Sequence, residues 1–243
     1  MIEPDRQLLR KKALAESDHP VLSAIREKAA TGSAWILIGS LAIRLHNGTI
    51  ANRSYLVDSN GELAARYDKI HMFDVQLDDG QSYRESETYQ PGNEAVLTDL
   101  PWGRLGLTIC YDVRFAYLYR TLAQNGAKMI SVPSAFTKLS GEAHWHVLQR
   151  ARAIETGCYV ISAAQCGTHA KGRQTYGHSL IVDPWGRVLA DQGEEVGVIT
   201  AEIDLAQVDQ ARARIPVLTH DRNYELSLST LSEHNDKLVQ LNR

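Results

Sequence analysis

Short apolar segments bounded by turn-forming residues recur along the 243-residue chain, and they constrain its fold more than any other feature. Segments of this length with apolar or alternating residues are typical of β-strands. The predicted strands are 35–41, 54–57, 63–67, 105–110, 129–133, 159–164, 179–182 and 196–203. The turns "SNGE" at 59–62 and "DPWGR" at 183–187 are each expected to join two strands as a tight hairpin.

Two stretches show helical rather than strand periodicity. Residues 19–30 carry apolar side chains at a helical spacing, and a second series repeats at intervals of three and four residues. The two series are Val21, Leu22, Ile25 and Ala29, and Ala143, Val147, Ala151 and Ile154. The chain is therefore predicted to be a mixed α/β protein. Because no linker or internal repeat divides it, residues 1–243 are expected to form one domain, with about 217–243 as a C-terminal tail or oligomer arm.

Composition limits the class of partner. The formal net charge is −3, and the Lys and Arg residues are scattered, so neither nucleic acid nor an anionic membrane is an expected partner. The N-terminus lacks the apolar core of a secretory signal, and the longest apolar stretch, 34–43, is too short to span a bilayer. Three cysteines fit neither a disulfide framework nor a zinc knuckle. The expected protein is cytoplasmic, has free thiols and acts on a small molecule.

Cys110 lies in "GLTICYDVRF" at 106–115, where an apolar strand ends and charged residues follow. Strand ends commonly present side chains to a crevice. A cysteine in an apolar strand is often a small buried filler, whereas a reactive thiol needs a nearby base or cation. Both interpretations stay open on this segment alone.

A possible cation follows another predicted strand. Lys69 stands in "RYDKIHMFDV", and Glu85 stands in the next loop, in "SYRESETYQPG". A lysine in such a place is ordinarily a solvated surface charge, and Glu87 and Glu94 compete with Glu85. Two strand ends with complementary chemistry nevertheless favour a joint site.

Other chemistries lack a sequence basis. None of the nine histidines stands in a recognisable catalytic motif, so His71 and His178 are interpreted as structural. His144 and His146 are two residues apart on a predicted helix and cannot share a face; with no HExxH motif, no metal is expected. Without a glycine-rich phosphate loop, no nucleotide or other cofactor is expected either.

Three segments together resemble the nitrilase superfamily of carbon–nitrogen hydrolases. They are "YDKIHMFDV", "GRLGLTICYDVRF" and "PSAFTKLSGEAHWHVLQRARAIETGCYVISAAQCG". The resemblance covers about residues 34–216. Within the superfamily, "RARAIETGCYV", "AAQCGTHAKGRQTYGHSLIVDPWG" and "RIPVLTH" look most like the amidases of deaminated glutathione, with the omega-amidases of α-keto acid amides next. The implied fold is a four-layer αββα sandwich, and the implied assembly is a homodimer or higher homo-oligomer whose helical layers meet.

The resemblance also implies residue roles. Cys110 would attack the amide carbonyl and form a thioester with loss of ammonia or an amine. Lys69, helped by the backbone N–H of Tyr111, would stabilise the oxyanion, and Glu85 would position the lysine or the substrate. Arg114, Thr137 and Arg173 are candidates to bind a substrate carboxylate. The other two cysteines, Cys158 and Cys166, are interpreted as apolar fillers.

One part of the family pattern is not found. The family's general base is a glutamate in a "PE" motif roughly seventy residues before the lysine, and counting back from Lys69 reaches the first residue of this chain. The expected fold therefore lacks the family's first strand, first helix and catalytic glutamate, and Glu3 is not assigned as the base. Two alternatives to an active amidase stay open: a nitrilase that attacks nitriles with the same thiol, and a catalytically impaired family member.

Overall fold

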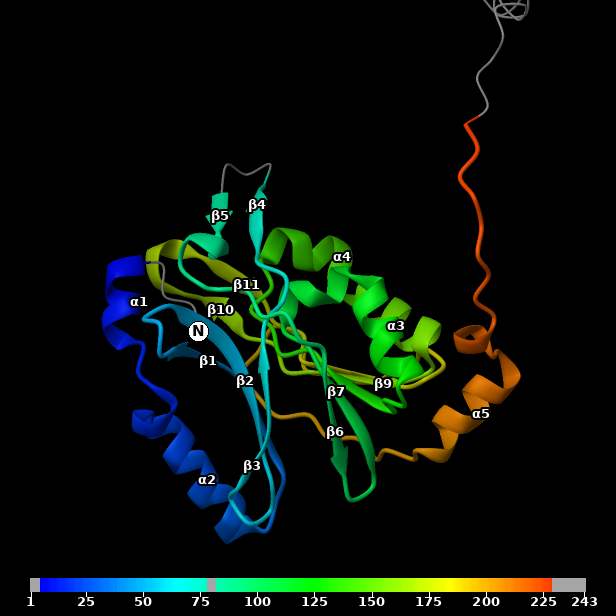
Figure 1. Ribbon diagram of the computed structural model, residues 1–243, viewed down its shortest axis with the longest axis horizontal. Helices are drawn as coiled ribbons and strands as arrows, with labels where there is room; N and C mark the ends of the chain where they lie inside the picture. The colour runs from blue at the N-terminus through cyan, green and yellow to red at the C-terminus, as the bar shows by residue number, and fades with distance from the viewer. Residues whose placement is uncertain (1–4, 78–81, 229–243) are drawn as a thin grey trace, which may run out of the picture.

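Two sheets packed face to face, with helices on both outer faces, make up a four-layer αββα sandwich in the computed structural model (Figure 1). The structure describes residues 5–77 and 82–228. Across these residues, no helix combines the length and the apolar character that a membrane span needs. The predicted four-layer αββα fold class is confirmed, and the expected lack of the family's first strand and first helix stays a prediction.

The first sheet is antiparallel, in the order β1-β2-β3. Its strands are β1 (Ile36–Arg44), β2 (Ile50–Val57) and β3 (Leu63–Asp68). The predicted "SNGE" turn joins β2 to β3, where Gly61 has φ +82°. A side chain is disfavoured in that conformation, which explains glycine at this position.

The second sheet has six strands in the order β13-β12-β9-β8-β7-β6. They are β6 (Val96–Leu100), β7 (Gly103–Leu107), β8 (Met129–Ser131), β9 (Tyr159–Ser162), β12 (Leu180–Val182) and β13 (Val188–Asp191). The β7-β8-β9 centre is parallel and the flanking pairs are antiparallel. The "DPWGR" turn joins β12 to β13 as predicted. Two small hairpins lie apart from this sheet: β4 (Asp74–Gln76) with β5 (Ser82–Arg84), and β10 (Cys166–Thr168) with β11 (Gln174–Tyr176).

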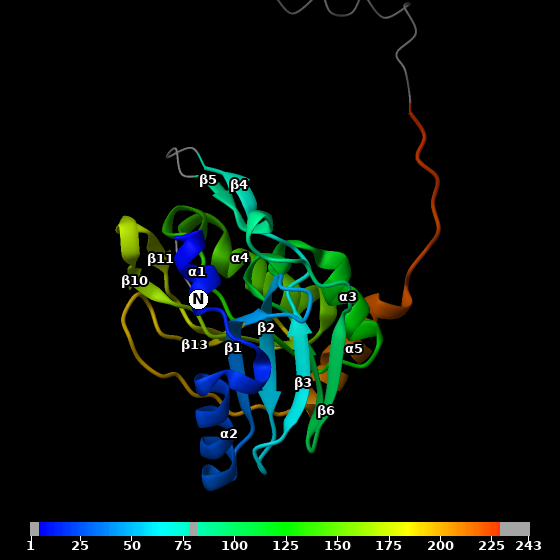
Figure 2. The same cartoon turned by 60° about the vertical axis from the view of Figure 1, so that its left-hand side comes forward.

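Helices cover both sheets. The α-helices are α1 (Arg6–Lys12), α2 (Pro20–Gly32), α3 (Ala116–Gln124), α4 (Lys138–Thr156) and α5 (Ala206–Arg214). Single 3₁₀ turns are η1 (Glu16–Asp18), η2 (Glu85–Glu87), η3 (Cys110–Arg114), η4 (Ala170–Gly172) and η5 (Val217–Thr219). Both predicted helices are confirmed, as α2 and α4. Figure 2 shows α2 against the three-stranded sheet, where its buried Leu22 packs with Leu41, Ile43 and Tyr55.

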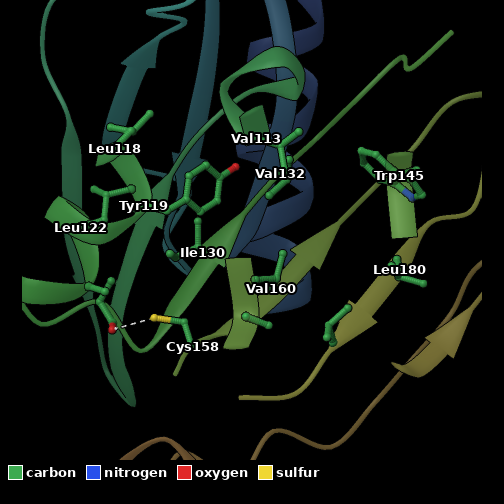
Figure 3. Close-up of a cluster of buried hydrophobic side chains, with 14 of the residues drawn as sticks. Val113, Leu118, Tyr119, Leu122, Ile130, Val132, Trp145, Cys158, Val160 and Leu180 are labelled. Atoms are coloured by element: carbon green, nitrogen blue, oxygen red, sulfur yellow. Dashed lines mark hydrogen bonds between the residues drawn. The ribbon is translucent and has the colours of Figure 1, made fainter. Parts of the chain in front are cut away.

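Apolar side chains fill the space between the two sheets and the space between the second sheet and its helices. Leu56 and Tyr67 of the first sheet pack against Leu107 of the second. On the other face, α3 and α4 pack on the sheet through the cluster drawn in Figure 3. Cys158 is part of this cluster; its thiol is fully buried and donates to the carbonyl of Ala127, 3.2 Å away. Cys158 is therefore buried in the core as predicted, although the guanidinium of Arg212 also donates to its sulfur at 3.1 Å.

The predicted strand at 196–203 is wrong, because no strand forms there. Apolar residues alternate in this stretch, but Val196 and Val198 are 91% and 88% exposed. Alternation favours a strand only where a neighbouring backbone and an apolar surface receive it. The first part of the stretch crosses open surface instead, and Ile203 packs against the core before α5.

The start of the predicted C-terminal tail is held on the body of the protein. Arg120 of α3 donates to the carbonyl of Val217 at 2.7 Å, and Gln124 donates to that of Leu218 at 3.0 Å. Residues 220–228 are exposed and have no regular structure, and the rest of the predicted tail lies outside the described residues.

Candidate active site

A cavity of about 740 Å³ lies where the ends of strands from both sheets meet. Lys69, Glu85 and Cys110 all line it, so the fold brings the three predicted catalytic residues to one space. Gly39 and Ser40 of β1, Pro133 and Ser134 after β8, and Ala163 to Gln165 after β9 complete much of the wall. Elements far apart in the sequence therefore build one pocket.

Cys110 stands in a strained turn immediately after the second sheet's β7 segment. Its φ is +50°, a left-handed conformation that non-glycine residues seldom adopt, and its N–H donates to the carbonyl of Pro133 at 2.9 Å. Such strain persists only where the surroundings impose it, and it is concentrated at functional sites. The strain and the place in the cavity favour a presented thiol over a simple filler.

The surroundings that impose this turn centre on the fully buried Asp112. Its carboxylate accepts the N–H of Ile109 at 2.8 Å and the hydroxyl of Tyr67 at 2.7 Å. It also accepts the backbone N–H of His71 at 3.1 Å and faces its Nδ1 at 2.7 Å. Burial, and next the charge of Asp112, raise the pKa of Tyr67, so its hydroxyl stays protonated and able to donate. Cys110 lies between Ile109 and Asp112, so the hydrogen bond between these two residues holds its backbone in place.

Lys69 follows β3 directly and is almost fully buried, at 3% exposure. Its Nζ forms an ion pair with Oε2 of Glu85. The same carboxylate accepts the N–H of Phe73 at 2.7 Å and the side-chain amide of Asn52 at 3.1 Å. A buried ammonium is costly unless it is paired, and Glu85 supplies that partner and holds Lys69 in position.

The cavity wall is strongly cationic. Its basic residues are Arg6, Lys69, Arg84, Lys171 and Arg173, and Glu85 is the only carboxylate among the described residues that line it. Arg173 is the most informative of the set. Its Nη2 donates to the carbonyl of Ala135 at 3.0 Å and its guanidinium lies over the ring of Tyr83, but its buried Nε has no hydrogen-bond partner among the described residues. Such a wall suits an anionic ligand.

The predicted substrate-binding residues Tyr111, Arg114 and Thr137 are not among the described residues that line the cavity. Tyr111 packs edge-on against Phe73, which does line it. The Arg114 guanidinium lies over another lining residue, Phe136, and burial lowers its pKa. Thr137 is buried and bonded to the hydroxyl of Ser140 at 2.6 Å. All three contact residues that line the cavity but do not line it themselves, and their roles stay predictions.

The two glutamates that compete with Glu85 in the sequence do not contact Lys69. Glu87 forms an ion pair with Arg6, and Glu94 is exposed, so Glu85 alone of the three competing glutamates faces Lys69. Glu3 lies outside the described residues. Arg173, the third candidate to bind a substrate carboxylate, does line the cavity, and its role stays a prediction.

Chemically, the site offers a thiol, an ammonium held by a carboxylate, and a cationic wall. A thiol can add to a carbonyl carbon, and a fixed ammonium can stabilise the negative charge that develops on the carbonyl oxygen. The arrangement is suited to acyl transfer to sulfur.

Comparison with known proteins agrees with this chemistry. A family model described as carbon–nitrogen hydrolase matches residues 5–213. A deaminated glutathione amidase of Yersinia enterocolitica is 44% identical over 227 residues, covering 92% of this chain and 79% of that protein. One from Synechocystis is 48% identical over 175 residues, covering 71% of this chain and 64% of that protein. The crystal structure of the Caenorhabditis elegans NitFhit protein has 41% identity and a TM-score of 0.84, covering 91% of this chain and 54% of that one. The chain therefore belongs to the carbon–nitrogen hydrolase family, as its motifs predicted.

Proposed function

We propose that this protein hydrolyses the amide bond of a small linear substrate that carries a carboxylate, with deaminated glutathione as the first candidate and α-keto acid amides as the second. The proposal rests on one observation: Cys110 and the Lys69–Glu85 ion pair line the same cavity, whose wall is cationic. The relatives named as deaminated glutathione amidases support this choice of substrate.

The reaction follows from the positions of these groups. The sulfur of Cys110 adds to the amide carbonyl carbon, and the ammonium of Lys69 stabilises the oxyanion. The C–N bond then breaks as the proton given up by the thiol passes to the leaving nitrogen, which leaves a thioester on Cys110 and releases ammonia or an amine. Water hydrolyses the thioester to a carboxylic acid and restores the thiol. An interaction of the Lys69 kind is worth about 3–4 kcal/mol of transition-state stabilisation.

Arg173 supports the anionic class of substrate. Its unpartnered Nε and the basic residues around it offer charge-assisted hydrogen bonds to a carboxylate. Arg173→Gln should raise KM for deaminated glutathione by about 10- to 100-fold, and Arg173→Lys should restore part of the loss. An uncharged amide of similar length should show little change. An equal rise in KM for the uncharged amide would argue against carboxylate recognition.

The main experiment compares substrates and variants in one assay of product amine. Wild-type protein is given deaminated glutathione, an α-keto acid amide and the matched nitrile, alongside Cys110→Ala. Cys166→Ala is the matched control, since that thiol is partly exposed and does not line the cavity. Cys110→Ala should lose at least about 10³-fold in kcat while the control keeps its activity. Amine release that survives in Cys110→Ala would overturn the mechanism, and faster turnover of the nitrile would identify a nitrilase instead.

One observation favours a second candidate, a family member with slow turnover. Glu85, the only carboxylate on the described cavity wall, already accepts hydrogen bonds from Lys69, Phe73 and Asn52. It is poorly placed to accept a proton from the thiol as well, and general base catalysis typically contributes about 10²–10⁴-fold in rate. Mass spectrometry of the protein at successive times after mixing with substrate separates the candidates: an unmodified Cys110 together with slow amine release indicates the slow acylation expected without a base, and rapid, complete acylation of Cys110 would contradict it.

We further propose that the protein works in the cytoplasm as a homodimer or higher homo-oligomer. Three free thiols favour a reducing compartment. Exposed apolar side chains along α4, among them Leu139, Val147 and Ile154, offer a surface for a second copy of the chain. Light scattering of Val147→Glu against wild type tests the assembly, because a charge in the contact should shift the mass toward the monomer.

A further inference from the structure

A cluster of three potential metal ligands lies outside the cavity, where α4 meets the edge of the second sheet. His146 comes from α4, His178 from the connection between β11 and β12, and Asp191 from the end of β13. One ligand atom from each residue lies within 4.8 Å of the other two. Three separate elements therefore converge on a single point, which the sequence spacing does not reveal.

The two imidazoles share one carboxylate. Nε2 of His146 lies 2.8 Å from Oδ2 of Asp191, and Nδ1 of His178 lies 2.8 Å from Oδ1. Two imidazole nitrogens and a carboxylate oxygen are the donor set that zinc takes in three-ligand sites, with water at the fourth position. All three side chains are partly exposed, at 32%, 19% and 30%, so an ion and its water can reach them. We propose that His146, His178 and Asp191 form a binding site for one zinc ion.

The ligands are held by a second layer of contacts, as metal ligands commonly are. Asp191 also accepts the N–H of Gly193 at 2.9 Å, and Nδ1 of His146 faces the hydroxyl of Tyr176 at 3.5 Å. The ring of Tyr176 stacks on that of His178 with centroids 4.3 Å apart. The carbonyl of His178 accepts the indole N–H of Trp145 at 2.9 Å. These contacts fix the rings before an ion arrives.

His178 is additionally held in a conformation that glycine would favour. Its φ is +56°, and its N–H donates to the carbonyl of Gly193 at 2.7 Å. This strained backbone directs the ring of His178 toward Asp191. Strained residues are concentrated at functional sites, which is consistent with a ligand role for His178. This site is separate from the catalytic one, since none of the three ligands lines the cavity. Its ion would tie the edge strand β13 to α4.

The test measures binding of zinc alone to the full chain after treatment with a chelator. A Cys110→Ser background removes the cavity thiol as a competing ligand. Isothermal titration calorimetry then compares this parent with Asp191→Asn, His178→Gln and His146→Gln. The matched control is His144→Gln, two residues along the same helix, whose ring contacts Arg114 instead.

The parent and the His144→Gln control should each bind one zinc ion, and each ligand variant should bind it at least about 100-fold more weakly, since even an outer-layer partner costs 10- to 100-fold. Cobalt in place of zinc should give visible bands of nitrogen and oxygen ligation without a thiolate charge-transfer band. A thiolate band, an absence of binding by the parent, or binding that all three variants keep would each overturn the proposal.

Folding of the variants is checked separately. The His146 side chain is 32% exposed and is not part of the apolar core, so His146→Gln should fold and give the circular dichroism of the parent. Zinc should raise the melting temperature of the parent and of His144→Gln, because an ion that binds only the folded state stabilises it. The same addition should leave the melting temperature of His146→Gln unchanged. An equal rise in His146→Gln would place the zinc elsewhere on the protein.

Discussion

The carboxylate of Asp112 accepts the N–H of Ile109 at 2.8 Å and so closes the turn that carries Cys110 between them. Asp112 also holds Tyr67 and His71, which stand on either side of Lys69 in the sequence. One buried carboxylate thus connects the segment of the nucleophile to the segment of the ammonium. The position of the sulfur depends on a residue that does not line the cavity.

Asp112→Asn should misplace the thiol without removing it. The amide has one acceptor oxygen in place of two, so part of the network around Ile109, Tyr67 and His71 loses its acceptor. We expect kcat to fall about 10- to 100-fold and the unfolding free energy to fall by about 2–3 kcal/mol. The rate of Cys110 alkylation against pH should also change, which a purely structural loss would not produce. Asp99→Asn, at an exposed ion pair with Arg104, is the control; an unchanged alkylation profile in Asp112→Asn would contradict the positioning role.

Glu85→Gln should release Lys69 from its partner while keeping the shape of the side chain. The ammonium then loses both its compensating charge and its fixed direction, so stabilisation of the oxyanion weakens. We expect kcat to fall by about 10²-fold or more with a smaller change in KM. Steady-state kinetics of Glu94→Gln, an exposed glutamate nearby in sequence, should match wild type. Similar losses in both variants would indicate that charge alone, and not the ion pair, is responsible.

Gly141→Ala should destabilise the contact between α4 and β11. A Cβ at this position would lie 2.3 Å from Cβ of Tyr176, far inside van der Waals contact. Overpacking of this kind typically costs about 1–3 kcal/mol, and here backbone must move. Gly32→Ala, whose added methyl meets no atom within 4 Å, serves as the control and should be neutral or slightly stabilising. Urea unfolding measures both; equal midpoints would show that the helix shifts freely.

Glu16→Gln should remove part of the acid sensitivity of folding. Hydrogen bonds from Arg66 lower the pKa of Glu16 below 4.5, although burial opposes them, and the hydroxyl of Tyr55 adds to the lowering. The folded state therefore binds this proton less readily than the unfolded chain. The contribution, about 1 kcal/mol, is full above pH of about 4.5 and is lost as pH falls through the folded-state pKa. Unfolding free energies at pH 7 and pH 3.5 should differ less in Glu16→Gln than in wild type or in the exposed control Glu195→Gln.

Much of the fold could be predicted from local pattern, and the failures have physical causes. Both turn motifs and both helical periodicities are confirmed because their signals are local. The stretch 196–203 alternates like a strand, but a strand also needs a partner that lies elsewhere in the chain. The short strands of the β4–β5 and β10–β11 hairpins have three residues each, too few for a period to show.

Some residues of the candidate site could likewise be predicted from local pattern, and others could not. Lys69 and Cys110 could be predicted because each follows a strand and stands in a motif. Arg173 is a candidate from the family resemblance, but its place in the cavity wall depends on the packing of the β10–β11 hairpin, which no local pattern predicts. The zinc ligands His146, His178 and Asp191 are spread over three elements, and the neighbouring pair weighed from the sequence, His144 and His146, is not the pair that meets.

The apolar residues that revealed α4 in the sequence are not the ones it buries. Val147 and Ile154 face outward at 67% and 53% exposure, while Gln149 and Arg152 are held inside. The helix therefore has an exposed apolar stripe in addition to the apolar side chains Trp145 and Ala153 that it buries. Exposure of this apolar stripe to water is unfavourable, so we expect two copies of the chain to associate through it. Because association stabilises the folded state by mass action, the melting temperature should rise with protein concentration. A dilute sample should melt earlier than a concentrated one.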